Sequence, residues 1–331
     1  MKTKIVYVLT SNEKDLLLEQ LLLSLYSLRH YNPSSEVYLV VDQDTFSTIK
    51  GPRNAVREYL TDVIAIKTPE EYNNMLRSRW LKTSLREHIK GDYLFIDSDT
   101  IITDSLEECD NWNFDIASVI DRHIPVDKAH QYYDLIIDNA KKTGWQFEKN
   151  DAFYFNSGVM FVKDNQTTHS FFKKWHEYWI QGIEKKVYQD QPTLGRTNKE
   201  FGYLMHELNG MWNCQVLANG IKFLNNSKIV HYFNAERQSQ RKSIFYLPSN
   251  KELYQEIKNS GFVLDDKIKE MIENGRCAFS LNYAVFADEQ LLAIRDSFSN
   301  FVIRGYFLKN KFYKFLRGLY SIYCNAKNVY K

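Results

Sequence analysis

The sequence of 331 residues contains little proline, glycine or cysteine. Six prolines and 13 glycines exclude a collagen-like or low-complexity chain. The four cysteines lie far apart and form no CxxC pair, which argues against a dense disulfide framework and against a cysteine-based metal cluster. This cysteine usage is typical of a reducing compartment, so we expect a cytoplasmic protein.

Long apolar runs and common nucleotide-binding motifs are also missing. No stretch of about 18 apolar residues is present, so the sequence predicts no transmembrane helix, and the first apolar run is too short for a signal peptide. Without a GxGxxG or P-loop pattern, a dinucleotide enzyme or an NTPase has no support. The net charge of +2 by itself indicates no class of partner.

Short apolar segments alternate with helical patterns over the first hundred residues. This alternation predicts an α/β fold with a mixed, mostly parallel sheet and flanking helices. We expect strands at 5–9, 37–41, 63–66, 93–96, 114–120, 159–162 and 229–233, and helices at 16–28, 55–60, 74–88 and 169–183. Residues 125–142 are expected to form a helix or an ordered insertion. The composition changes at about residue 240. This change predicts a catalytic domain over 1–240 and a helical, increasingly basic region over 241–331.

Two carboxylates follow one of these apolar segments. Asp97 and Asp99 flank Ser98 directly after Tyr93–Ile96. Ligands of open α/β sheets bind at the carboxyl ends of strands, where two such carboxylates can hold one Mg²⁺ or Mn²⁺ and leave coordination positions open for phosphate oxygens. A cation there neutralises the charge on a departing diphosphate. The competing interpretation is a pair of solvated loop aspartates.

The segment resembles the D-x-D metal motif of GT-A glycosyltransferases, and the wider pattern over about residues 3–237 resembles their retaining family 8. That family includes bacterial galactosyl- and glucosyltransferases of surface glycans. The resemblance implies a GT-A fold, and it assigns Asp97 and Ser98 to the nucleotide sugar and Asp97 and Asp99 to the metal.

Three further segments carry the resemblance. Asn156, in a segment similar to F-N-[SA]-G-V, would contact the hydroxyls of the donor sugar. Asp190 and Gln191, similar to the D-Q motif of the family, are the expected catalytic pair: Asp190 would hold the transferred sugar and Gln191 would lie beside its anomeric carbon. His231 matches the start of H-x-x-G-x-x-K and would be the third metal ligand, which favours Mn²⁺ over Mg²⁺. Arg237 replaces the lysine of that motif and would clamp the diphosphate.

The basic helix before the carboxylates is expected to face the nucleotide. Lys82 fits the spacing of the family, whereas Arg77 and Arg79 compete for the arginine role. Thr10 and Asn12 follow the first strand, where family members hold the uracil ring, but the usual aspartate and tyrosine are absent.

Together these features predict a metal-dependent hexosyltransferase that moves a sugar from a UDP-sugar to a glycan or lipid-linked acceptor in bacterial surface polysaccharide or lipopolysaccharide synthesis. The alternatives are a catalytically silent glycan- or lipid-binding scaffold, a nucleotidyltransferase, and an inverting GT-A enzyme. Inversion needs a carboxylate base, for which Asp151, Asp190 and Glu207 are candidates.

The last 35 residues contain no acidic side chain. From Ser297 to Lys331 seven lysines and arginines alternate with many aromatic residues. This composition favours a peripheral contact with the inner face of an anionic membrane. A helix packed on the domain and a nucleic-acid-binding patch are the alternatives; we expect no nucleic-acid partner.

Overall fold

The computed structural model describes residues 1–127, 130, 132–148, 151, 153–233 and 246–279, with five further positions between 315 and 322. Its strands are β1 (Lys4–Leu9), β2 (Val37–Asp42), β3 (Asp62–Ile66), β4 (Tyr93–Ile96), β5 (Thr100–Ile102), β6 (Ile116–Ile120), β7 (Phe155–Val162), β8 (Met205–Glu207), β9 (Cys214–Gln215) and β10 (Ile229–His231). Its α-helices are α1 (Leu17–Tyr31), α2 (Gln43–Thr48), α3 (Asn74–Thr83), α4 (Tyr133–Lys142), α5 (Gln166–Glu184), α6 (Gln191–Glu200), α7 (Lys251–Asn259) and α8 (Asp266–Glu273).

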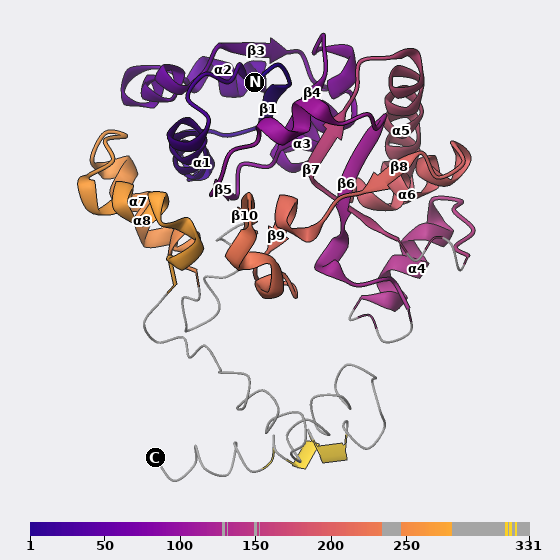
Figure 1. The fold of residues 1–331 in the computed structure, drawn as a ribbon. Coiled ribbons are helices and arrows are strands. Elements are labelled where there is room, and N and C mark those ends of the chain that lie inside the picture. The colour runs from indigo at the N-terminus through magenta and orange to yellow at the C-terminus, as the bar shows by residue number, and fades with distance from the viewer. Residues whose placement is uncertain are drawn as a thin grey trace.

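Seven of the described strands form the central sheet, in the order β3-β2-β1-β4-β7-β6-β8 (Figure 1). The first four are parallel to one another, β7 is antiparallel to both of its neighbours, and β8 is parallel to β6. The expected mixed, mostly parallel α/β sheet is therefore confirmed. Because β1 and β4 are parallel neighbours, the loops that follow them lie at the same edge of the sheet.

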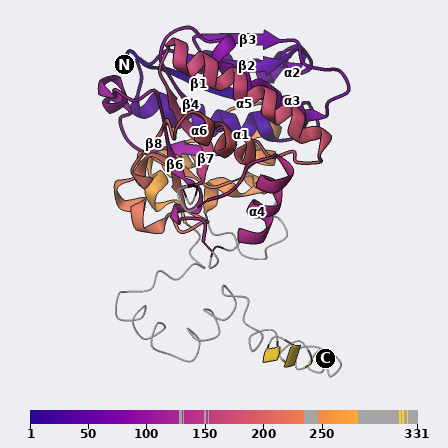
Figure 2. The same ribbon diagram turned by 90° about the vertical axis from the view of Figure 1, so that its right-hand side faces the viewer.

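Alternating apolar side chains build a core on each face of this sheet. On β1, Ile5, Tyr7 and Leu9 pack with the leucines of α1, whereas Val6 and Val8 pack with α3 and α5. Figure 2 views the molecule from the side of α5 and α6. Helix α5 begins with a capping box of Asn165 and Thr168, and α3 is preceded by the N-cap Asn73, whose side chain accepts a hydrogen bond from the Leu76 amide.

A second sheet of three described strands, β5-β10-β9, lies beside the end of the main sheet. The strand expected at 229–233 is confirmed over Ile229–His231, and it belongs to this second sheet rather than to the main one. Residues Ile229–His231 pair antiparallel with β5 and parallel with β9 instead. Neither β5 nor β9 is long enough to show an apolar alternation of its own, so the sequence gives no indication of this sheet.

Several helix predictions need correction. The segment expected as a helix at 55–60 is a 3₁₀ helix, Gly51–Tyr59, which starts with Pro52 at its first turn. The helix expected at 74–88 ends at Thr83 and continues as a separate 3₁₀ turn, Leu85–Glu87. Within the insertion expected at 125–142, the helical part is Tyr133–Lys142.

Helices α7 and α8 pack against α1, and their apolar residues join the same core cluster (Figure 1). The Tyr31 hydroxyl donates to the Glu273 carbonyl at 2.7 Å, and the Tyr26 hydroxyl donates to the Glu273 carboxylate at 2.5 Å. Nearly all of the basic aromatic tail lies outside the described residues, and the predicted division at residue 240 stays a prediction. Among the described residues, no helix is long and apolar enough to cross a bilayer.

His176 of α5 makes stability depend on pH. Its Nδ1 lies 2.7 Å from the Thr83 hydroxyl of α3, and burial lowers its pKa from 6.5 to about 4, with His88 adding to the effect. The unfolded chain therefore takes up a proton below pH 6.5 that the folded chain resists, so this contribution is complete above pH 6.5 and is lost as the pH falls towards 4.

We therefore expect His176→Gln to reduce the acid-induced loss of stability between pH 7 and pH 5 by about 1–2 kcal/mol, after allowance for partial exposure. Urea denaturation at the two pH values measures the difference. The same substitution at an exposed histidine, His206→Gln, is measured in parallel as the control. An identical loss in wild type and His176→Gln would contradict the assignment.

Candidate functional site

The two aspartates and the histidine predicted as metal ligands lie together. Asp97, Asp99 and His231 each direct one ligand atom towards a common point, and these atoms all lie within 4.8 Å of one another. The Asp99 Oδ1 is 3.2 Å from the His231 Nε2. The Asp97 side chain is 32% exposed, whereas that of His231 is 3% exposed, so the cluster is buried on one side and open on the other.

Backbone pairing holds the cluster in place. The Asp97 amide donates to the Gly158 carbonyl at 2.7 Å, and the Tyr232 amide donates to the Asp99 carbonyl at 3.1 Å. Strand β7 passes so close that a Cβ at Gly158 would lie 2.5 Å from the His231 Cε1 and 2.8 Å from the Asp97 Oδ2. Glycine is therefore required at this position for a steric reason.

Lys82 links this cluster to the predicted catalytic aspartate. Its Nζ lies 3.1 Å from the Asp97 Oδ1 and 3.7 Å from the Asp190 Oδ2. The Arg79 Nε lies 3.8 Å from the Asp190 Oδ1. Arg77, the competing arginine, is instead paired with Asp42 and Asp44 after β2. The structure therefore brings Arg79 and Lys82 to the site and directs Arg77 away from it.

The buried charges shift one another's pKa values in opposite directions. Burial raises the pKa of Asp97, and Asp99 adds to this, while Lys82 opposes it. Burial also raises the pKa of Asp99, but the charge and hydrogen bond of His231 lower it by more. The pKa of Asp99 therefore lies below its usual range. Burial lowers the pKa of His231, but Asp99 outweighs it and the pKa is raised. Asp99 and His231 thus each favour the charged form of the other.

Asp190 is also held as a carboxylate. Burial raises its pKa, but Lys82 and Arg79 outweigh that effect, so the pKa of Asp190 lies below its usual range. Its Oδ2 also accepts a hydrogen bond from the Ser157 hydroxyl at 2.7 Å. Sequence reasoning missed Ser157, although it stands inside the recognised segment. The adjacent Gln191 donates through Nε2 to the Phe155 carbonyl at 3.1 Å.

The side chain of Asn156 is hydrogen-bonded at both ends of its amide group. Its Nδ2 donates to the Asp121 carboxylate at 2.8 Å, and its Oδ1 accepts from the Gly158 amide and from the Asn213 side chain, each at 2.9 Å. Neither Asp121 nor Asn213 was predicted as a site residue. Asn213 follows no strand pattern or known motif, so nothing in the sequence indicates its place.

The predicted base-binding residues lie at the same sheet edge but do not contact the acidic cluster directly. The Thr10 hydroxyl donates to the Asn74 carbonyl at 2.8 Å, and the Asn12 Oδ1 accepts from the Lys14 amide at 2.8 Å. The Ser98 hydroxyl accepts from the Gln20 Nε2 at 3.4 Å. Arg237 lies outside the described residues.

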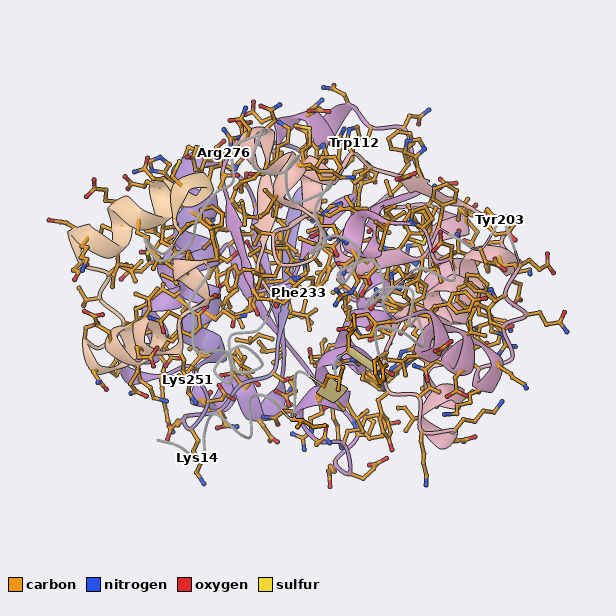
Figure 3. All side chains as sticks on the ribbon, turned by 90° about the horizontal axis from the view of Figure 1, so that it is seen from below. Lys14, Trp112, Tyr203, Phe233, Lys251 and Arg276 are labelled. Carbon is orange, nitrogen blue, oxygen red and sulfur yellow. The ribbon has the colours of Figure 1, made fainter. Side chains whose placement is uncertain are left out.

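The two remaining candidate bases line one cavity with Phe155, the residue before Asn156. Asp151 and Glu207 line a cavity of about 230 Å³ beside α6 and β8, together with Tyr203 and other residues. One oxygen of Asp151 accepts from the Lys199 Nζ at 3.2 Å. Seen from below, Tyr203 lies towards the edge of the molecule, whereas Phe233, whose ring centroid is 4.6 Å from that of His231, lies near the middle (Figure 3).

The donor set fits a divalent cation. Two carboxylate oxygens and one imidazole nitrogen suit Mn²⁺, and the exposed side of Asp97 leaves room for further oxygen ligands. The neighbouring lysine does not fill the cluster, because its Nζ is in contact with Asp97 and Asp190 rather than with Asp99. The three residues are therefore able to hold a metal.

Residues 54–237 match the family described as glycosyl transferase family 8. The chain belongs to this family. It is therefore a glycosyltransferase, as the D-x-D resemblance predicted, and a silent scaffold or a nucleotidyltransferase is not supported. No curated protein sequence matches the chain significantly.

Two solved structures of the glycosyltransferase LgtC share the GT-A fold of this family 8 member, and a third structure, of GlyE, is less similar. The galactosyltransferase LgtC, in complex with donor and acceptor sugar analogues, is 17% identical, with a TM-score of 0.52, over 81% of this chain and 99% of LgtC. An active-site variant of LgtC gives a TM-score of 0.53 at 16% identity, over 80% and 98% of the two chains. GlyE of Streptococcus pneumoniae gives 0.49 at 15% identity, over 86% and 67%.

The close approach of Gly158 yields a prediction about the cluster. In Gly158→Ala the added methyl group would push His231 and Asp97 apart, so we expect Mn²⁺ affinity to fall by about tenfold or more. Isothermal titration calorimetry measures the affinity. Val159→Ala is the matched control: it removes buried apolar atoms from the same strand and costs stability, but its affinity for Mn²⁺ should equal that of wild type. Equal affinities in all three proteins would contradict the prediction.

Proposed function

We propose that this family 8 enzyme transfers a hexose from a UDP-sugar to a glycan or lipid-linked acceptor, with Mn²⁺ as the preferred cation and Mg²⁺ as a substitute. The observation that carries the proposal is the group of Asp97, Asp99 and His231 within 4.8 Å, beside the cationic side chains that hold Asp190. The bound cation would act as a Lewis acid on the diphosphate.

The protein's own residues would stabilise the diphosphate and bind the sugar. Lys82 lies between the metal cluster and Asp190, where its positive charge stabilises negative charge on a diphosphate. Asp190, kept ionised by Lys82 and Arg79, accepts hydrogen bonds from sugar hydroxyls. Asn156 and Gln191 are the sequence neighbours of the hydrogen-bonded pair Ser157 and Asp190, and they would hold the transferred sugar beside β7.

We also propose retention of the anomeric configuration. A base on the far face of the sugar is needed for inversion, and two of the three candidate carboxylates, Asp151 and Glu207, lie together in the cavity beside α6. The third, Asp190, is bonded to Ser157 and paired with two cations. Proton NMR of the first product formed distinguishes the two outcomes through the anomeric coupling.

Metal dependence is tested with the double variant Asp97→Asn and Asp99→Asn, which preserves shape and removes both negative charges. We expect Mn²⁺-dependent binding of UDP, and UDP-sugar hydrolysis that EDTA abolishes in wild type, to fall at least about tenfold. Asp104→Asn is the control, since Asp104 follows the same segment but pairs with Arg276. A double variant that binds UDP-sugar with full metal dependence would refute the assignment.

A further proposal concerns location. The basic, aromatic composition of residues 297–331 supports a cytoplasmic enzyme that lies on the inner membrane face and acts in the synthesis of a bacterial surface polysaccharide or lipopolysaccharide. A lipid-linked acceptor would be presented at the same surface.

The membrane contact is tested in the full chain with Lys309, Lys311, Lys314 and Arg317 changed together to Gln. Each cation near an anionic surface contributes about 1 kcal/mol, so the variant should lose about 4 kcal/mol of binding. Co-sedimentation with vesicles of phosphatidylglycerol measures this loss, and vesicles of phosphatidylcholine are the control. Equal sedimentation of both proteins with anionic vesicles would exclude the tail as the contact.

A further inference from the structure

Asn213 occupies a fully buried position between the metal cluster and the sugar-binding residues. It ends the 3₁₀ helix Gly210–Asn213, directly before β9, and its relative exposure is 0%. Its Oδ1 lies 2.9 Å from the His231 Nδ1, and its Nδ2 lies 2.9 Å from the Asn156 Oδ1. Both ends of one amide are thus used, each by a different part of the site.

The direction of each of these linked hydrogen bonds follows from the groups at the start, which can act only as a donor or only as an acceptor. The Gly158 amide can only donate, so the atom of Asn156 that it contacts is the carbonyl oxygen. The Asp121 carboxylate accepts from the other end of Asn156, which is therefore the NH₂ group. Asn213 must then present its own NH₂ group to the Asn156 oxygen, which leaves its carbonyl oxygen for His231.

The orientation of Asn213 decides how the imidazole is used. An amide oxygen only accepts, so the Nδ1 of His231 carries a hydrogen. The Nε2 is then the nitrogen that faces Asp99 and the point shared with Asp97. A metal-binding histidine requires such a partner on its second nitrogen to fix the tautomer and the ring angle.

We propose that Asn213 is a positioning residue that sets two groups at once: the tautomer and ring angle of His231, and the amide orientation of Asn156. The proposal rests on the proposed function in that it treats His231 as a metal ligand and Asn156 as a contact of the donor sugar. The same buried amide supplies the acceptor for His231 and the donor for Asn156.

Two substitutions separate the two tasks. Asn213→Asp keeps an oxygen for the His231 Nδ1–H but loses the donor to Asn156, so Mn²⁺ affinity should stay within about threefold of wild type while the KM for the donor sugar rises. Asn213→Ala loses both contacts, so Mn²⁺ affinity should fall about 10- to 100-fold, as for other partners of metal-bound histidines. Calorimetry of Mn²⁺ binding and donor kinetics give these readouts.

A third readout needs neither metal nor activity. Long-range ¹H–¹⁵N correlation spectra of protein labelled in histidine report which ring nitrogen carries the hydrogen, and the His231 signal is assigned from its absence in His231→Gln. At a pH where the ring is neutral, wild type and Asn213→Asp should both show the Nδ1–H form, whereas Asn213→Ala should show a mixture or the Nε2–H form.

The control is Asn198→Ala. Asn198 is another buried asparagine, and its side chain accepts from the Met205 amide, so the variant loses a buried hydrogen bond without touching the cluster. Thermal unfolding identifies any variant that does not fold. A folded Asn213→Ala with the tautomer and the Mn²⁺ affinity of wild type would overturn the proposal. Failure of wild type to bind Mn²⁺ would refute the proposed function, while the tautomer of the metal-free protein would still decide the role of Asn213.

Discussion

The site depends on one buried cation between two carboxylates. The Lys82 ammonium lies 3.1 Å from Asp97 and 3.7 Å from Asp190, and 4.7 Å from the ring centroid of Phe95. Without a positive charge, two anions at this depth would pay a desolvation cost of several kcal/mol each. Lys82 therefore allows an acidic metal cluster and an ionised sugar-binding carboxylate to exist side by side in one fold.

The strands bring these charged residues together. Strand β4 delivers Asp97 and Asp99 to its carboxyl end, and the antiparallel β7 enters from the opposite direction with Asn156 and Gly158. Strand β10 then brings His231 from the far end of the catalytic region. Three segments distant in sequence thus meet where two strands of opposite direction pass each other, and only a residue without a side chain fits at the crossing.

The parts of this arrangement that follow local rules could be predicted from the sequence. Strand β4 and the carboxylates after it were predictable because a short apolar run and a D-x-D pattern are both local. The family resemblance added His231, Asn156 and Asp190, whose proximity no spacing rule could supply. The second sheet was missed because β5 and β9 are too short for periodicity to appear.

Two other features were beyond sequence reasoning for a different reason. The choice between Arg77 and Arg79 depends on the direction in which each side chain leaves α3, and the structure decides it by pairing Arg77 with Asp42 and Arg79 with Asp190. Asn213 matters only through its two partners, which lie 57 and 18 residues away in sequence. Residues whose role is to orient other residues leave no pattern of their own.

The side chains of Lys82 and Asp190 are 10% and 9% exposed. Their interaction should therefore respond to salt differently from interactions between charges on the protein surface. Dissolved salt screens charges that face water, but it hardly reaches a pair enclosed by protein. Ionic strength therefore acts on charges that face water while leaving the charges of the transfer site almost untouched. A single salt titration can distinguish how the enzyme reaches its substrate from how it handles the substrate once bound.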